Sequence, residues 1–361
     1  MLRRTFLGTA ATAAASATAS PASPAAGTGI RLGFDTYSIR AFKWKAIQLL
    51  DYAAGLKLDA IQLSSLGDYE SLEPAYLQQV KDHAARVGIA IDAGMGCICP
   101  TSSTYNTKKD GDPAENILKG LRVAKAVGSS SMRCFLGSAA ERPEIGRHIE
   151  STIKVFRAVR SRALDMGVKI ALENHSGDLT ARDVRTIIEE SGKDAVGSCL
   201  DTGNPMWSAE HPLVTLETLA PYVLTTHFRD WTVCEHPRGA LLQWVALGDG
   251  CIDFKRFVSV FRTACPNANI HLEIITGRKP EVLAYWEPEF WKLFPNMYAA
   301  DFARFLMLAK NGHPFMGNMV MGGWKEPPVI EAALKEQQRV DLERSLEYAK
   351  KVLGVGIRWK G

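Results

Sequence analysis

Short apolar runs alternate with longer segments of helical periodicity along most of this 361-residue chain. The longer segments place apolar residues three or four positions apart, as Ile149, Ile153 and Phe156 do, which indicates amphipathic helices. The short runs are typical of buried strands, and strands separated by helices can pair only as parallel neighbours. The predicted strands are Ile30–Phe34, Ala60–Leu63, Ile89–Gly94, Ser131–Phe135, Val168–Leu172, Val196–Leu200, Tyr222–Thr226 and Asn269–Glu273.

Eight strands that alternate with helices over roughly 250 residues are typical of a (β/α)8 TIM barrel. An open doubly wound sheet is the structural alternative, but it would require a Gly-rich turn after the first strand. Asp35-Thr36-Tyr37-Ser38 follows that strand and contains no glycine. We therefore expect an α/β protein with a TIM barrel over residues 28–279.

The pattern changes after Thr276, where aromatic residues crowd a helical stretch and a Gly/Met-rich loop follows. A long charged amphipathic helix is predicted over Glu331–Val352. Residues 280–361 therefore form a C-terminal helical extension. It either closes the ring of helices and covers the carboxyl ends of the strands, or it forms a dimer contact or packs at the side of the barrel.

The extreme N-terminus differs from the rest of the chain. Arg3 and Arg4 precede a weakly apolar Ala/Thr-rich run that ends in small residues, which is typical of a twin-arginine export signal over residues 1–27. No later stretch is apolar for long enough to span a bilayer, so we expect a periplasmic protein without stable membrane insertion. Seven cysteines without metal-type spacing predict no disulfide framework.

Polar residues follow four of the predicted strands. Since parallel strands present their carboxyl ends on one face of a barrel, these residues should meet there. Carboxylates and imidazole are ligands for a divalent metal ion. The four residues are Glu173, Asp201, His227 and Glu273. The alternative explanation for the buried glutamates is an ion pair with Arg133 or Arg229.

The same residues resemble a known family, the xylose isomerase-like TIM barrels, which include sugar isomerases and epimerases, inosose dehydratases and an abasic-site endonuclease. The matching segments are Ala171–His175, Leu200–Asn204, Thr226–Asp230, Gly248–Gly250 and Leu272–Ile274. The resemblance implies one divalent cation, Mn²⁺, Mg²⁺ or Co²⁺, held by Glu173, Asp201, His227 and Glu273. It also implies that Glu173 and Glu273 act as acid and base on a keto-sugar that passes through an enediolate.

Some residues depart from the pattern of the ketose epimerases. Asn204 stands where epimerases usually carry a histidine that grips the substrate, and Arg229 resembles the cation of dehydratase-like members. His175 lies two residues after Glu173, on the same side of an extended chain, and is a further catalytic candidate. Arg133 and Trp231 complete the predicted substrate-binding residues, although buried packing explains the tryptophan equally well.

Two functions therefore remain open, a metal-dependent sugar isomerase or epimerase and a lyase or hydratase that eliminates from a 3-keto-glycoside or an inosose-like compound. The exported location and the lack of a Gly-rich phosphate-binding loop favour an uncharged sugar over a sugar phosphate. A nucleic-acid enzyme is disfavoured because the net charge is only +4. A binding protein without catalysis is disfavoured by the acid/base glutamate pair. We expect a carbohydrate as the partner, with self-association into a homo-oligomer left open.

Overall fold

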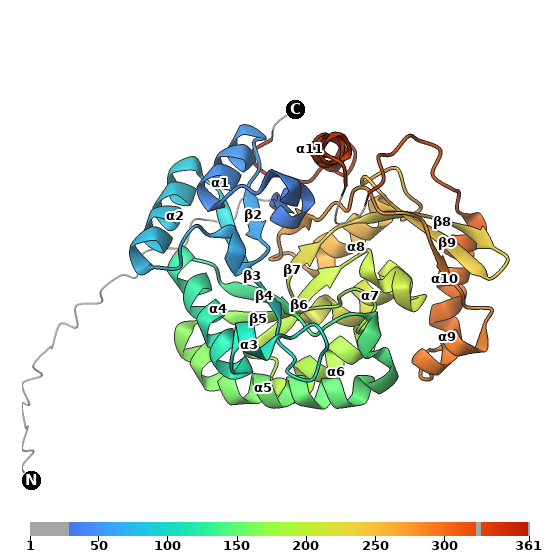
Figure 1. The fold of residues 1–361 in the computed structure, drawn as a ribbon, viewed down its shortest axis with the longest axis horizontal. Coiled ribbons are helices and arrows are strands. Elements are labelled where there is room, and N and C mark those ends of the chain that lie inside the picture. The colour runs from blue at the N-terminus through green and yellow to red at the C-terminus, as the bar shows by residue number, and fades with distance from the viewer. Residues whose placement is uncertain (1–28, 323–325, 360–361) are drawn as a thin grey trace, which may run out of the picture.

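Eight parallel strands close into a barrel in the computed structural model, which describes residues 29–322 and 326–359 (Figure 1). The strand order is β10-β1-β2-β3-β4-β5-β6-β7, and the ring closes where Phe228 N donates to His271 O at 2.8 Å. The barrel strands are β1 Leu32–Asp35, β2 Ala60–Leu63, β3 Ala90–Cys97, β4 Ser131–Phe135, β5 Lys169–Glu173, β6 Val196–Asp201, β7 Val223–His227 and β10 Ile270–Leu272. The eight predicted strands and the predicted TIM barrel are confirmed. The predicted export signal lies outside the described residues.

Helices surround the strands, and their ends follow local sequence signals. In α4, for example, the Asp112 side chain accepts hydrogen bonds from Ala114 N and Glu115 N at 3.0 Å, and Pro113 occupies the first turn. The helix ends at Gly128, whose φ of 84° is one that glycine adopts without strain. The α-helices are α1 Ala46–Gly55, α2 Pro74–Val87, α3 Thr107–Asp110, α4 Pro113–Val127, α5 Ile145–Met166, α6 Ala181–Ser191, α7 Pro212–Leu219, α8 Phe254–Ala264, α9 Pro288–Leu293, α10 Ala299–Asn311 and α11 Pro328–Lys351.

The last helix, α11, closes the outer ring between α1 and α8 (Figure 1). Tyr52 Oη on α1 donates to Glu343 Oε1 at 3.0 Å, and Lys350 Nζ donates to Leu56 O at 2.6 Å. On the other side, Arg262 of α8 donates to Gly354 O at 2.6 Å. The last long helix of the C-terminal extension is therefore the eighth helix of the barrel. Within the described ranges, no helix is both long and apolar enough to cross a membrane.

A second sheet lies mainly in the segment after His227, between the seventh and eighth predicted strands, where the sequence analysis predicted no strand. It is antiparallel, with the order β11-β9-β8, and its strands are β8 Asp230–His236, β9 Gly239–Val245 and β11 Glu281–Leu283. Pro237 and Arg238 form the turn between β8 and β9. The sequence analysis missed this hairpin because a distant element, α10, packs against β8.

Five short 3-10 helices complete the described chain: η1 Thr36–Phe42, η2 Leu66–Asp68, η3 Ala139–Glu144, η4 Asn204–Ser208 and η5 Ala220–Tyr222. Of these, η1, η2 and η4 follow barrel strands directly, so their residues lie at the carboxyl ends of the strands. All seven cysteines of the chain are unpaired in the structure.

Candidate functional site

Four strand ends bring their polar residues to one point at the carboxyl-end face of the barrel. Glu173 ends β5, Asp201 ends β6 opposite His227 at the end of β7, and Glu273 follows β10. His227 Nδ1 lies 3.1 Å from Glu173 Oε1, 2.9 Å from Glu273 Oε2 and 3.7 Å from Asp201 Oδ2. One ligand atom from each of the four residues lies within 4.8 Å of the others, and all four residues are buried. We call these residues the strand-end cluster.

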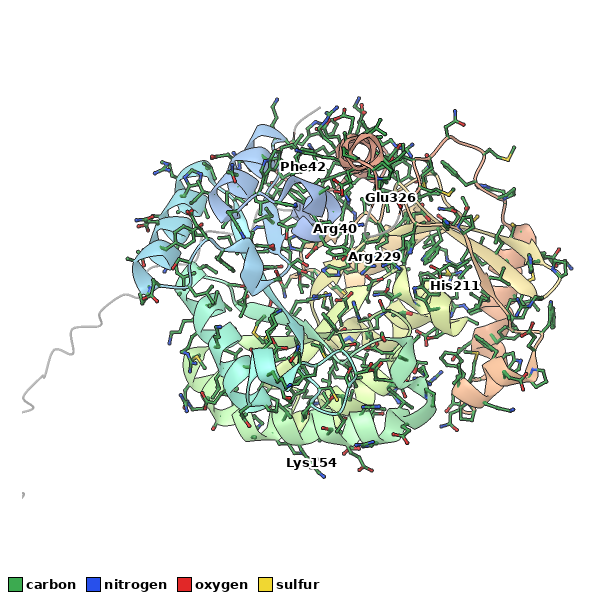
Figure 2. All side chains as sticks on the ribbon, viewed as in Figure 1. Arg40, Phe42, Lys154, His211, Arg229 and Glu326 are labelled. Atoms are coloured by element: carbon green, nitrogen blue, oxygen red, sulfur yellow. The ribbon has the colours of Figure 1, made fainter. Side chains whose placement is uncertain are left out.

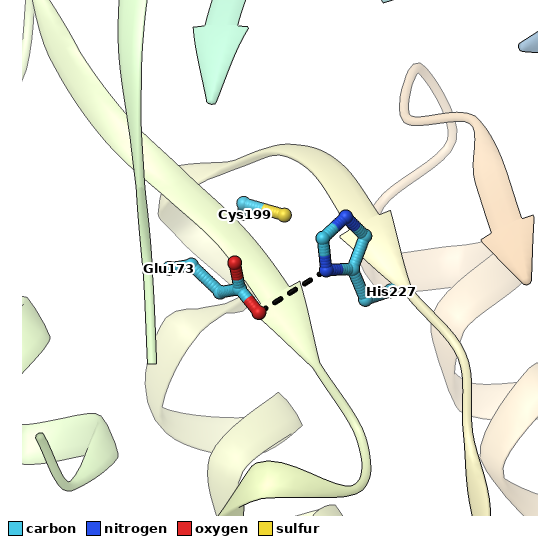
Figure 3. Close-up of side chains that lie close together, drawn as sticks. All are labelled: Glu173, Cys199 and His227. Carbon is cyan, nitrogen blue, oxygen red and sulfur yellow. Dashed lines mark hydrogen bonds and ion pairs between the residues drawn. The ribbon is translucent and has the colours of Figure 1, made fainter. Parts of the chain in front are cut away.

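Cys199 lies beside this cluster, and Figure 3 shows Glu173 and His227 directed toward each other next to it. The thiol belongs to a second geometrically possible ligand group with Glu173 and His227. Burial raises the pKa of Cys199 to about 11, so it remains protonated near neutral pH. Since a metal binds the thiolate, the carboxylate set is the better ligand group.

Two arginines neutralise part of the cluster. Arg133 Nε donates to Glu173 Oε2 at 2.5 Å, and its carboxylate partner is completely buried. Arg229 Nη2 lies 2.6 Å from Asp201 Oδ2 and 3.2 Å from Glu173 Oε1, and it also contacts Glu273 Oε2. The ion pairs that the sequence left as an alternative are thus present together with the converging ligands. Three carboxylates therefore face two guanidinium groups and His227, whose pKa nearby negative charges raise well above its usual value although burial opposes this.

The charges within the cluster determine the protonation of its carboxylates. Burial alone would raise the pKa of Glu173, but the charges of Arg133 and His227 hold it well below its usual range. In the same way, Arg229 and His227 outweigh burial and lower the pKa of Glu273 to about 2. Burial raises the pKa of Asp201 to about 7, because Arg229 only partly offsets it and the other two carboxylates repel its charge.

The unpartnered oxygens of the cluster and its set of donor atoms both fit a divalent cation. Asp201 Oδ2 and Glu273 Oε2 are buried and accept no hydrogen bond from the described residues, and their contacts with Arg229 are ion pairs only. Both atoms lie close to His227 Nδ1. Carboxylate oxygens with one imidazole nitrogen suit Mn²⁺, Mg²⁺ or Co²⁺.

The orientation of His227 is set from inside the barrel. Its Nε2 contacts Gln62 Oε1, and an amide oxygen can only accept, so Nε2 carries the proton. Gln62 Nε2 in turn donates to Thr225 Oγ1 at 3.0 Å, which holds the amide in this orientation. His227 Nδ1 therefore faces the carboxylates of Glu173 and Glu273 and donates its proton to them, and release of that proton would free a lone pair for a metal ion.

The chain of hydrogen bonds continues deeper. Thr225 Oγ1 donates to Asp92 Oδ2 at 2.7 Å, and His271 Nε2 lies 2.8 Å from the same oxygen. Gln62 and Asp92 were not predicted as site residues. The available signal was a polar residue inside a short apolar strand, in Ala60–Leu63 and in Ile89–Gly94.

His175 is held at the rim of the cluster. Its ring stacks on Phe135, with centroids 3.9 Å apart, and its Nδ1 lies 2.7 Å from Gly137 O. Because a carbonyl can only accept, Nδ1 carries the proton and Nε2 is the nitrogen with a free lone pair. Burial lowers the pKa of His175 to about 4, so the ring is neutral near pH 7.

The two remaining predicted substrate-binding residues differ in position. Asn204 Nδ2 donates to Glu173 Oε1 at 3.1 Å, and Asn204 N donates to Asp201 Oδ1 at 2.6 Å. Asn204 therefore orients two carboxylates of the strand-end cluster. Trp231 is fully buried, stacks on Trp244 with centroids 3.5 Å apart, and donates from Nε1 to Gly203 O. Trp244 and Trp207, rather than Trp231, line the cavity above the cluster.

That cavity has a volume of about 1120 Å³ and opens above the strand-end cluster. Its floor includes Glu273, Arg229 and Arg133, and its walls include His175 and Asn204. The predicted catalytic residues Glu273 and His175 therefore line one cavity, whereas Glu173 lies beneath it, completely buried. A cavity of this size accommodates a small sugar together with water.

Comparison with known proteins identifies the group to which the chain belongs. Residues 50–293 match the family described as "Xylose isomerase-like TIM barrel". A 3-oxo-isoapionate decarboxylase from Pectobacterium atrosepticum is 24% identical over 250 residues, which cover 66% of this chain and 83% of that protein.

The fold is shared with solved structures. A D-psicose 3-epimerase with D-tagatose from Clostridium cellulolyticum H10 matches with a TM-score of 0.55 and 14% identity, over 90% of this chain and 99% of that chain. The IOLI protein with a bound zinc atom matches with a TM-score of 0.53 and 16% identity, over 78% of this chain and 95% of that chain. The family match covers well over half of the chain and spans seven of the eight barrel strands, so this protein belongs to the xylose isomerase-like TIM barrel family.

Proposed function

We propose that this protein is a divalent-metal-dependent isomerase or epimerase that moves a proton next to the carbonyl group of a keto-sugar. The observation that carries the proposal is the strand-end cluster, in which buried carboxylates, two of them with an oxygen that accepts no hydrogen bond from the described residues, converge with His227 Nδ1 on the floor of a cavity. Glu173, Asp201, His227 and Glu273 would hold the cation. When bound, the cation would polarise a carbonyl oxygen and stabilise the enediolate that forms when a neighbouring proton departs.

Proton transfer is assigned to residues of the cluster and its rim. Glu273 lines the cavity, and its side chain is held only by His227 and Arg229 among the described residues, so we propose it as the group that removes the proton. Glu173 and His175 are the two groups proposed to return it. Arg133 opposes protonation of Glu173, whereas His175 Nε2 is free of protein partners among the described residues.

A second function is favoured by the position of Arg229, which lines the cavity and touches three carboxylates of the cluster. A guanidinium there can bind an oxygen that departs from the substrate, which is what a lyase or hydratase acting on a 3-keto-glycoside requires. Asn204 in place of a substrate-binding histidine and the similarity to a decarboxylase support the same direction. Both functions use the same enediolate.

The test incubates Mn²⁺-loaded protein with a panel of ketohexoses in D₂O and, separately, with a 3-keto-glycoside. Epimers or isomers that carry deuterium support the isomerase or epimerase. Release of the aglycone supports the lyase. Bound metal with neither product contradicts both functions.

We also propose that the protein is exported through the twin-arginine signal predicted in residues 1–27. Replacement of Arg3 and Arg4 by lysine should retain the full-length chain in the cytoplasmic fraction, whereas the unaltered chain should appear in the periplasm in a shortened form. Equal distribution of the two proteins would contradict the proposal.

A further inference from the structure

The mouth of the cavity above the strand-end cluster is rich in positive charge. Arg40, Lys43, Lys45 and Arg278 line it in addition to the two arginines of the cluster. The acidic residues of the mouth are Asp68 and Glu281. Asp68 accepts hydrogen bonds from Thr36 Oγ1 at 2.6 Å and from Ser65 N at 3.2 Å, so its carboxylate already has partners. Positive charge is therefore in excess at the mouth.

The Arg40 side chain is held by two contacts with Tyr37. It lies in η1, its Nη1 donates to Tyr37 O at 3.0 Å, and its guanidinium stacks 4.3 Å from the centre of the Tyr37 ring. These contacts hold the side chain in place but use only one of its N–H groups, and they involve no carboxylate. Across residues 29–322 and 326–359, Arg40 has no ion-pair partner, although it is half-buried.

Arg40 and Arg278 approach the same region from different parts of the chain. Arg278 follows β10 and Glu273, and its carbonyl accepts a hydrogen bond from Gln243 Nε2 at 2.8 Å, which fixes the backbone there. Burial lowers the pKa of Arg40, the charges of Tyr37 and Glu273 oppose this, and the positive charges of Arg278 and Arg229 add to the lowering. Figure 2 shows Arg40 and Arg229 close together near the middle of the molecule.

Arg40 lies beside other cations at the edge of the cavity, and the charge of Glu273 acts on it, but no carboxylate of the described residues forms an ion pair with it. A guanidinium with free N–H groups binds a carboxylate with two parallel hydrogen bonds. We propose that Arg40 and Arg278 form an anion subsite that binds a carboxylate of the substrate, so that the substrate is a keto-sugar acid. This inference rests on the proposed function and replaces the expectation of an uncharged sugar.

The experiment measures binding rather than turnover. A 2-ketohexose and the 2-ketohexuronate with the same carbon skeleton are titrated calorimetrically into the Mn²⁺-loaded protein. The uronate should bind about tenfold more tightly or better, because charge-assisted hydrogen bonds are the stronger ones. Arg40→Gln and Arg278→Gln should each remove most of this preference.

Control variants separate the subsite from general charge effects and from misfolding. Arg122→Gln removes an exposed arginine of α4 that does not line the cavity, and it should keep the full preference. Arg278 is exposed, so its replacement should leave the unfolding transition unchanged. Equal binding of the two sugars by the unaltered protein would overturn the inference, as would an unchanged preference in both variants. Tighter binding of a ketose phosphate than of the uronate would overturn the assignment of a carboxylate.

The failure of this inference differs from failure of the proposed function. Conversion of uncharged ketoses without any preference for the acid would leave the function standing and remove the subsite. A preference for the acid that depends on Arg40 and Arg278, without conversion of any keto-sugar, would leave the subsite standing and remove the function.

Discussion

Glu173 and Glu210 are both buried in this barrel, but their neighbours differ. Glu173 lies against Arg133, Arg229 and His227, and these charges keep its pKa low despite burial. Among the residues that the structure describes, Glu210 accepts hydrogen bonds from Thr215 Oγ1, at 2.6 Å, and from Ala181 N alone. Burial raises the pKa of Glu210 to about 7.

The comparison shows that burial by itself raises the pKa of a carboxyl group. Neighbouring cations lower this pKa and so keep the carboxylate ionised. The strand-end cluster therefore offers ionised oxygens to a cation, whereas Glu210 is a hydrogen-bonded structural group near the rim. Four predictions test this difference, in order of decreasing expected effect.

Glu273→Gln should reduce kcat by about 10³-fold, since it removes both a metal ligand and the proposed proton acceptor. Glu210→Gln, which replaces the other kind of buried carboxylate, should leave kcat within about twofold. Steady-state kinetics and metal content of both variants provide the measurement. Comparable losses of kcat in the two variants would show that the carboxylates do not differ in role.

Arg133→Met should lower the free energy of unfolding by about 3–5 kcal/mol, because Glu173 would keep its buried charge without its closest partner. The matched control is Arg160→Met, which breaks an exposed ion pair with Asp194 and should cost less than about 1 kcal/mol. Denaturant unfolding of both variants gives the two values. If the Arg133 variant lost no more than the control, the counter-charge would not be what holds Glu173 in its ionised form.

Gln62→Met should weaken Mn²⁺ binding by about 10- to 100-fold, because His227 Nε2 loses the acceptor that orients the ring. Gln78→Met, on the exposed face of α2, is the control and should bind Mn²⁺ like the unaltered protein. Metal titration followed by calorimetry distinguishes the two. Unaltered affinity in the Gln62 variant would mean that the ligand face of His227 is set by other contacts.

Glu210→Gln should change the pH dependence of stability by about 1–2 kcal/mol. The pKa of Glu210 is raised from an unfolded value of about 4.3 to about 7 in the folded state. The folded protein therefore binds the proton more tightly than the unfolded chain does. The resulting contribution to the free energy of unfolding is fully present below the unfolded pKa and is lost as the pH rises through the folded pKa of about 7. The glutamine variant does not titrate, so it should gain stability relative to the unaltered protein between pH 5 and pH 8. An equal difference at both pH values, measured by denaturant unfolding, would contradict the raised pKa.

Much of the fold followed from periodicity. The eight strand segments were predicted because buried parallel strands are continuous apolar runs. Helix ends also follow local signals, as Gly128 and Gly167 show. The β8–β9 hairpin was missed because its pairing is supported by α10, which lies more than fifty residues further along the chain. A single segment carries no sign of such a partner.

The sequence predicted the four candidate metal ligands but not the residues around them. Parallel strands in a barrel place all their carboxyl ends on one face, so Glu173, Asp201, His227 and Glu273 had to approach one another once the strands were assigned. Gln62 lies 165 positions from His227, and its role became apparent only when both side chains were seen inside the closed barrel.

The order of strands and helices and the acidic and histidine residues at four strand ends were determined by the sequence alone, because both depend on contacts between neighbours in the chain. The tertiary structure decided which cations neutralise which carboxylates, which nitrogen of His227 faces the carboxylates, and that Arg40 lines the cavity without an ion-pair partner among the described residues. These features depend on distances between residues far apart in the chain. Such distances exist only after the barrel has closed.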